Sequence, residues 1–143
     1  MSILQISPDK EKAKVFLDRA EGATKVLHTI IKIENPDIPF ILHTEYDIFH
    51  MLSIAILAFD GEKIQDKDHH KALLARIVEK YSSQLSPSHA YVLDELRKIR
   101  NDINYYGEKD TAVLQDFYER NKKSLDSLRS HLFGLIREKL CSK

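Results

Sequence analysis

Apolar residues recur along the chain at the three- and four-residue spacing of amphipathic helices, and the alternation typical of strands is missing. The pattern predicts helices over residues 8–33, 40–59, 68–81, 87–106 and 111–140. Ser7-Pro8 and Ser86-Pro87 each have the form of an N-cap followed by proline at the first helical position, and Gly61 and Gly107 end the second and fourth helices. The predicted fold is all-α, an up-and-down antiparallel helical bundle of four long helices plus one short helix.

Two of the predicted helices have distinctive apolar patterns. Residues 46–59 are apolar on most sides, which is typical of a helix surrounded by others, so this helix is predicted to be central. The last helix carries a near-heptad series of apolar residues that Asn121 interrupts. Two interpretations stay open for that series, a dimerisation element or the core face of a bundle helix.

Composition limits the function classes. The 143 residues are enough for one domain, 1–143, and no Pro/Gly/Ser-rich linker divides them. Because 22 basic residues balance 22 acidic ones, an anion-binding surface would have to be local. The single cysteine, Cys141, suits a reducing compartment, and we find neither a signal peptide nor a run of about 20 apolar residues. A cytoplasmic protein without membrane contact is expected.

The densest chemistry lies in the run 96–107, at the end of the fourth predicted helix. Helical spacing places Arg100 over Asn104 and Asn101 over Tyr105, so that a guanidinium, two amides and a phenol share one face. This face suggests a phosphate or nucleotide contact. For Arg100 the alternative is a salt bridge to an acid such as Asp94 or Glu95, and for the amides it is hydrogen bonding at the helix end.

Histidines supply the other candidates. His43, Asp47 and His50 are spaced as three metal ligands on one helical face, although the same spacing suits an amphipathic or interface face, and no metal is predicted. His69 and His70 point about 100° apart, so they cannot easily chelate one ion. They can act as a first-turn cap contact and a half-buried packing residue. Glycine-rich phosphate loops and nucleophile elbows are missing, so no cofactor is expected.

Several of these features together resemble the HEPN superfamily. They are the order of the helices, the segment 46–61, the Asp68-His69-His70-Lys71 helix start and the Arg100-Asn101 pair. The resemblance implies a helical-bundle homodimer. Because it includes residues 68–71, it also implies that His69 or His70 can line the same cleft as Arg100. Many HEPN proteins are metal-independent endoribonucleases, while others pair with a minimal nucleotidyltransferase in toxin–antitoxin systems or simply bind RNA or nucleotides.

The chain departs from the family's motif at one position. In the family's motif, four to six residues separate the arginine from a histidine. Here that histidine would fall at positions 105–107, which hold Tyr105, Tyr106 and Gly107. Histidine, with an ordinary pKa of about 6.5, exchanges protons near neutral pH, whereas tyrosine at about 10 does so poorly. Binding therefore survives this change better than catalysis.

Two functions are compatible with the sequence. The first is binding of RNA or a nucleotide, with binding candidates Arg97, Arg100, Asn101, Asn104, Tyr105 and His69. Whether the chain is an enzyme stays open; if it is a non-standard metal-independent endoribonuclease, Arg100, Asn101 and Tyr105 are the catalytic candidates. The second function is that of a non-catalytic protein-interaction subunit, homodimeric and paired with a nucleotidyltransferase or another effector. Cations converging around Arg100 would favour the first, and an exposed apolar patch would favour the second.

Overall fold

The computed structural model describes residues 2–105 and 111–142, without the side chains of 102–105. In chain order the elements are β1 (Ile3–Gln5), α1 (Lys10–Ile31), α2 (Ile38–Asp60), β2 (Glu62–Ile64), α3 (His69–Lys80), α4 (Pro87–Tyr105) and α5 (Thr111–Cys141). Helices α1, α2, α4 and α5 have 22, 23, 19 and 31 residues, and α3 has 12. The predicted all-α bundle of four long helices and one short helix is therefore confirmed.

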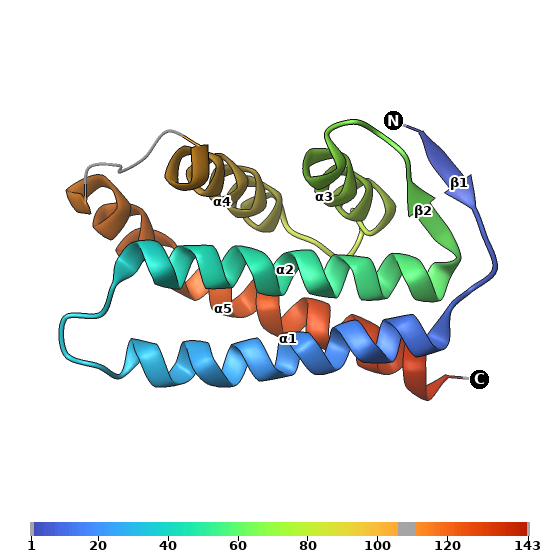
Figure 1. Cartoon of the computed structure of the whole chain (residues 1–143), viewed down its shortest axis with the longest axis horizontal. Helices are drawn as coiled ribbons and strands as arrows, with labels where there is room; N and C mark the ends of the chain where they lie inside the picture. The colour runs from blue at the N-terminus through green and yellow to red at the C-terminus, as the bar shows by residue number, and fades with distance from the viewer. Residues whose placement is uncertain (1, 106–110, 143) are drawn as a thin grey trace.

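Helix α2 lies at the centre of the bundle, as its apolar pattern predicts. Figure 1 shows α1 on one side of α2 and both α3 and α4 on the other, and α2 contacts all four of the other helices. Its side chains Ile41, Phe49, Leu52 and Ile56 are fully buried. By length and composition α2 could cross a membrane, but most of this stretch is buried inside the bundle. Packing against the other helices thus accounts for its apolar character.

A small sheet, which the sequence pattern did not predict, joins the chain start to the end of α2. Strands β1 and β2 pair antiparallel, with Ile3 opposite Ile64. The Ile6 amide continues the pairing by donating to the Gly61 carbonyl over 2.8 Å. The prediction without strands was wrong here because three-residue strands are too short to show an alternating pattern.

The helix ends follow local capping chemistry. The Ser86 hydroxyl accepts a hydrogen bond from the His89 amide over 3.1 Å, which confirms this predicted cap. The Ser7 cap was wrong, because α1 begins at Lys10 and Asp9 caps it by accepting from the Lys12 amide over 2.9 Å. The Asp9 amide also donates to the Ala58 carbonyl over 2.8 Å, so contact with α2 sets where α1 begins.

The apolar spacing of α1 does not match its buried face at one position. Val15 follows the apolar spacing but is 45% exposed, while Ala13 and Leu17 beside it are buried. The reason is that the face of α1 that packs against α2 is narrow. Not every apolar residue of the helix therefore lies on the buried face.

A buried ion pair joins α2 to α5. Glu45 and Arg129 are only 1% and 7% exposed, and the Arg129 guanidinium donates to Glu45 and to Asp126. Burial raises the pKa of the Glu45 carboxyl, and the charge of Arg129 opposes this rise. Because a buried charge is stable only when it is paired, this contact fixes the position of α5 along α2.

We predict that Gly61→Ala destabilises the fold. Gly61 has φ of 74°, and a Cβ there would lie 2.5 Å from the Ile6 carbonyl oxygen. We expect the free energy of unfolding, measured in urea, to fall by about 2 kcal/mol or more, because both the left-handed backbone and the clash oppose a side chain. The matched control is Gly22→Ala within α1, where nothing lies within 4 Å of the added Cβ. That change should raise stability by about 0.5–1 kcal/mol. Equal effects would contradict this account.

A second prediction concerns the buried ion pair. Arg129→Met leaves the Glu45 carboxylate buried and alone, so chemical unfolding should show a loss of about 3–5 kcal/mol. Adding Glu45→Leu should recover most of that loss because no buried charge then remains. Arg137→Met is the control, since the Arg137–Glu21 pair is exposed and should contribute under about 1 kcal/mol. A double variant as unstable as Arg129→Met would refute this interpretation.

Candidate functional site

Polar side chains from three helices meet where α2, α3 and α4 pack together. We call this group the Arg100 cluster and define it as Tyr46, Asp47 and His50 from α2, His70 from α3 and Arg100 from α4. Tyr46 and His50 lie one helical turn apart, so both face α3. His70 lies in the first turn of α3, which Asp68 fixes by accepting from the Lys71 amide over 3.2 Å.

Tyr46 holds the cluster together. Its hydroxyl oxygen lies 3.1 Å from Nδ1 of His70, and the Arg100 guanidinium carbon lies 4.8 Å from the centre of its ring. Burial raises the pKa of Tyr46 to about 12, against the opposing charge of Arg100, so the phenol keeps its proton. One ring therefore orients both an imidazole and a guanidinium.

Arg100 is held by a carboxylate on another helix. Its Nε lies 3.7 Å from Oδ1 of Asp47, while the other Asp47 oxygen lies 3.3 Å from His43 Nδ1. Arg100 Nε is buried and has no hydrogen-bond partner among the residues that the structure describes. The alternative of a salt bridge is thus realised, but with Asp47 rather than the acids that the sequence suggested.

Those two acids bind other cations. Asp94 pairs with Arg97 and Lys98 at 3.2 Å, and Glu95 pairs with Lys98 at 3.5 Å. All of these pairs lie along α4 itself, three or four residues apart. Arg100 points instead to the neighbouring helix because its own helix offers it no carboxylate on the same side.

The histidines of the cluster are stacked and neutral at physiological pH. The rings of His50 and His70 lie 4.4 Å apart, and His69 lies 6.2 Å from each of them. Burial, reinforced by His70, His69 and Arg100, lowers the pKa of His50 to about 4. Burial also lowers the pKa of His70, with Arg100 the next cause. Nε2 of His50 is buried without a hydrogen-bond partner.

The spacing of His43, Asp47 and His50 does not build a metal centre. Asp47 lies between His43 and Arg100, whereas His50 turns to stack on His70. Within the part of the chain that the structure describes, no three His, Cys, Asp or Glu side chains are arranged to hold a metal ion. The same residues instead form an interface face between helices.

The remaining sequence candidates are only partly brought together. His69 lies beside His50 and His70, and Asn101 is half-buried on α4 next to Arg100. Arg97 pairs with Asp94 and borders an apolar pocket of about 320 Å³ between α3 and α4. The side chains of Asn104 and Tyr105, and the predicted stop at Gly107, lie outside the described residues.

Sequence reasoning missed the roles of Tyr46 and His50. Tyr46 was placed among core residues and His50 among potential metal ligands, and neither was linked to Arg100. The sequence did contain a hint, because Tyr46 and His50 carry polar atoms and lie one turn apart on a mostly apolar helix. Their partners on α3 and α4 could not be identified, because sequence spacing says nothing about contacts between helices.

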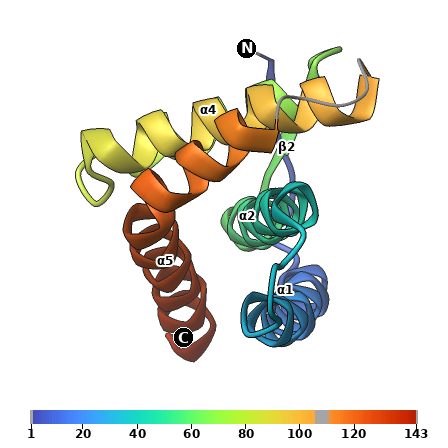
Figure 2. The ribbon, with the colours of Figure 1, turned by 90° about the vertical axis from the view of Figure 1, so that its left-hand side faces the viewer.

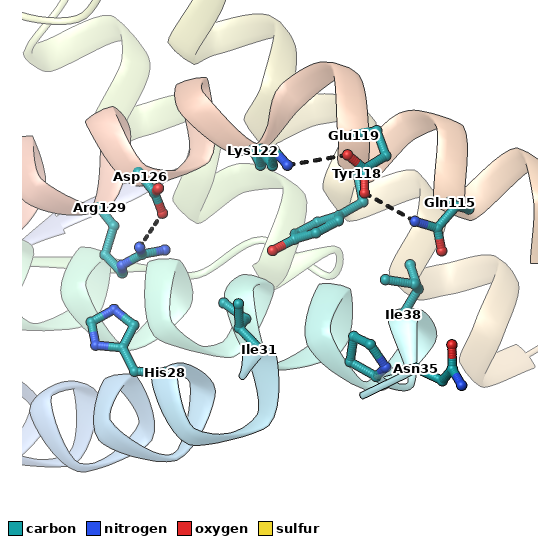
Figure 3. Close-up of a pocket in the computed structure, with 11 residues that line it drawn as sticks. His28, Ile31, Asn35, Ile38, Gln115, Tyr118, Glu119, Lys122, Asp126 and Arg129 are labelled. Carbon is teal, nitrogen blue, oxygen red and sulfur yellow. Dashed lines mark hydrogen bonds and ion pairs between the residues drawn. The ribbon is translucent and has the colours of Figure 1, made fainter. Parts of the chain in front are cut away.

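A larger cavity than the pocket between α3 and α4 lies elsewhere, in a groove between α1 and α5 (Figure 3). It has a volume of about 760 Å³, and Tyr118, His28 and Arg129 face it. Its cations are already paired, Lys122 with Glu119 and Arg129 with Asp126. The cations of the groove are therefore compensated by carboxylates, as Arg100 is by Asp47. Figure 2 shows α1 on the side of α2 away from α4, whereas α5 runs beside α2 and also contacts α4.

The chain matches no protein-family model, no curated protein sequence and no solved structure. The arrangement of the side chains is therefore the basis for a functional conclusion.

The neutral, half-buried His50 makes the stability of the fold sensitive to acid. The pKa of His50 is about 4 in the fold and about 6.5 unfolded, so the unfolded chain binds a proton first as pH falls. Stability should be fully present above pH 6.5 and lost between about 6.5 and 4, by about 2 kcal/mol after allowance for partial exposure.

Unfolding in urea across this pH range tests the assignment. His50→Phe should remove most of the acid sensitivity attributed to His50, because a phenyl ring can stack but cannot titrate. The control is His28→Gln, which changes an exposed histidine on α1 and should keep the wild-type pH profile. An unchanged profile in His50→Phe would assign the effect to other groups.

Proposed function

We propose that this chain is a HEPN-like domain that binds RNA or a nucleotide through phosphate contacts of Arg100 and Asn101. The observation that carries the proposal is the position of Arg100, whose guanidinium lies over Tyr46 and whose Nε is 3.7 Å from the Asp47 carboxylate. A guanidinium over a ring keeps N–H groups at its edge, where a phosphate can accept two hydrogen bonds.

The surroundings of Arg100 also support an anionic ligand. Three histidine rings lie within the same region, and imidazole can donate a hydrogen bond to a phosphate or stack on a base. Asp47 is the one carboxylate paired with Arg100 among the described residues, and it is shared with His43. The charges around Arg100 are close to balanced, so the proposal rests on the geometry of the guanidinium and the neighbouring imidazoles and not on an excess of positive charge.

The proposal extends to metal-independent RNA cleavage. In that reaction the 2′-oxygen bonds to phosphorus and the 5′-oxygen leaves, so one proton must be removed and one returned. Positions 105–107 lack the expected histidine, but His70 on α3 brings an imidazole to the hydroxyl of the same Tyr46 ring that Arg100 lies over. Arg100 would stabilise the extra negative charge on the phosphate.

One observation favours the second candidate, a protein-interaction subunit. The pocket between α3 and α4 is lined mainly by apolar side chains, namely Leu74, Ala75, Val78, Ala90 and Leu93. The large side chain of Tyr91 on α4 is 56% exposed. Such a surface suits a second copy of the chain or a partner such as a minimal nucleotidyltransferase in the cytoplasm.

Arg100→Ala tests the main proposal. We expect affinity for labelled single-stranded RNA, measured in chelator at low and moderate salt, to fall at least about tenfold, because a charge-assisted hydrogen bond is worth about 1.5–3 kcal/mol. The melting temperature should change little, since Arg100 lies at the rim of the core. Any cleavage should be lost in parallel.

The matched control is Arg120→Ala on α5, which removes an exposed arginine paired with Asp116 and should bind RNA like the wild type. Equal losses in both variants would indicate non-specific attraction. If the wild type neither binds nor cleaves RNA and binds no nucleotide, the protein-interaction function is favoured instead. Unfolding of Arg100→Ala would show that Arg100 is structural.

A further inference from the structure

We propose that phosphate binding at the Arg100 cluster is coupled to the uptake of one proton by His70, with the Tyr46 hydroxyl as hydrogen-bond partner in both protonation states. This inference rests on the proposed function and deepens it. It makes ligand affinity dependent on pH through a group on α3, outside the arginine motif on α4.

The cluster without ligand disfavours a charged His70. Facing it are Tyr46, Asp47 and His50 from α2, Asp68 and His69 from α3, and Arg100 from α4. Burial and the charge of Arg100 lower the pKa of His70, and the carboxylates of Asp68 and Asp47 only partly offset them. Arg97 lies farther along α4 and is paired with Asp94.

Tyr46 can serve both forms of His70 without moving. When His70 is neutral, the Tyr46 hydroxyl donates to Nδ1 over 3.1 Å, and the imidazole proton is on Nε2. When His70 is protonated, Nδ1–H donates and the same hydroxyl oxygen accepts. Because burial raises the pKa of Tyr46 to about 12, the phenol stays neutral and does not compete for the proton.

The stacked His50 limits the uptake to one proton. Its ring lies 4.4 Å from His70, so charging both would place two like charges in contact. His50 is also the more buried of the two, with Nε2 shielded from solvent, and its pKa is about 4. The proton therefore goes to His70, whose Nε2 makes no hydrogen bond to the described chain.

A bound phosphodiester changes this balance. Its negative charge offsets that of Arg100 and accepts a hydrogen bond from Nε2 of His70, and both effects favour the charged imidazole. The pKa of His70 is then higher in the complex than in the free protein. By linkage, affinity must rise as pH falls between these two pKa values, by up to about tenfold per pH unit for one proton.

Calorimetry with a non-cleavable probe tests the coupling. The probe is a short 2′-O-methyl oligouridylate, whose diesters and bases do not titrate between about pH 6 and pH 8, and which cannot be cleaved through a 2′-hydroxyl. Titrations in two buffers of different ionisation enthalpy report the number of protons taken up on binding. We expect uptake approaching one proton in the wild type and tighter binding at the lower pH.

The variants identify the group that takes up the proton. His70→Gln should bind with little proton uptake and a flat pH dependence, and Tyr46→Phe should reduce the uptake. His28→Gln, on the exposed face of α1, should behave like the wild type. NMR titration of the His70 ring in the wild type, with and without the probe, gives the same answer even if a variant does not fold, since its pKa should rise on binding.

The outcomes separate the two proposals. Binding that requires Arg100 but takes up no proton, or uptake that persists in His70→Gln, overturns the coupling and leaves the proposed function intact. A wild type that binds the probe at neither pH overturns the coupling, and it overturns the proposed function as well when unmodified RNA and nucleotides also fail to bind.

Discussion

The packing of α2 on all sides is the constraint on which the rest of the structure depends. Helices α1, α3, α4 and α5 all contact it, so nearly every face of α2 is an interface. The consequence is visible at two consecutive residues. Glu45 faces Arg129 on α5, and Tyr46 faces His70 and Arg100 on α3 and α4. Since neighbouring residues on a helix point about 100° apart, one step along α2 changes the interface.

The polar groups at these two interfaces differ in how completely they are paired. The Glu45–Arg129 pair is almost completely buried, and Asp126 supplies the guanidinium with a second acceptor, so its requirements are met within the protein. In the Arg100 cluster, by contrast, buried Nε of Arg100 and Nε2 of His50 have no hydrogen-bond partner among the described residues, and neither has Oγ of Ser53 on α2. Buried polar atoms without partners are rare because they lower stability. The polar side chains at this interface are therefore less completely paired within the described chain than Glu45 and Arg129 are.

Much of the fold could be predicted because it depends on local patterns. The Ser86 cap, the start of α3 after Asp68 and the stop at Gly61 follow from chemistry within a few residues. The cap of α1 was misplaced because contact with Ala58, distant in sequence, decides it. The two strands were missed because three residues carry no period.

The candidate site shows the same division. Arg100 and His69 could be singled out by residue type, and the resemblance placed both near one cleft. The partners of Arg100 could not be found in this way, because Asp47 and Tyr46 are more than fifty residues away along the chain. Helical spacing relates residues on one helix only. Helical spacing therefore suggested a metal site for His43, Asp47 and His50. In the structure Asp47 pairs with His43 and Arg100, whereas His50 stacks on His70.

The absence of a histidine at positions 105–107 is weaker evidence against proton transfer than the sequence alone suggests. A motif records where a family places a group, but chemistry requires only that the group reach the phosphate in a suitable protonation state. Here the imidazoles of His50 and His70 lie beside the Tyr46 ring, and the Arg100 guanidinium lies over the same ring. A neutral imidazole near a guanidinium can accept a proton, and its pKa rises when a phosphate offsets the cation. Under the proposed function, the group that would exchange a proton is therefore sought at His70 on α3 and not at positions 105–107.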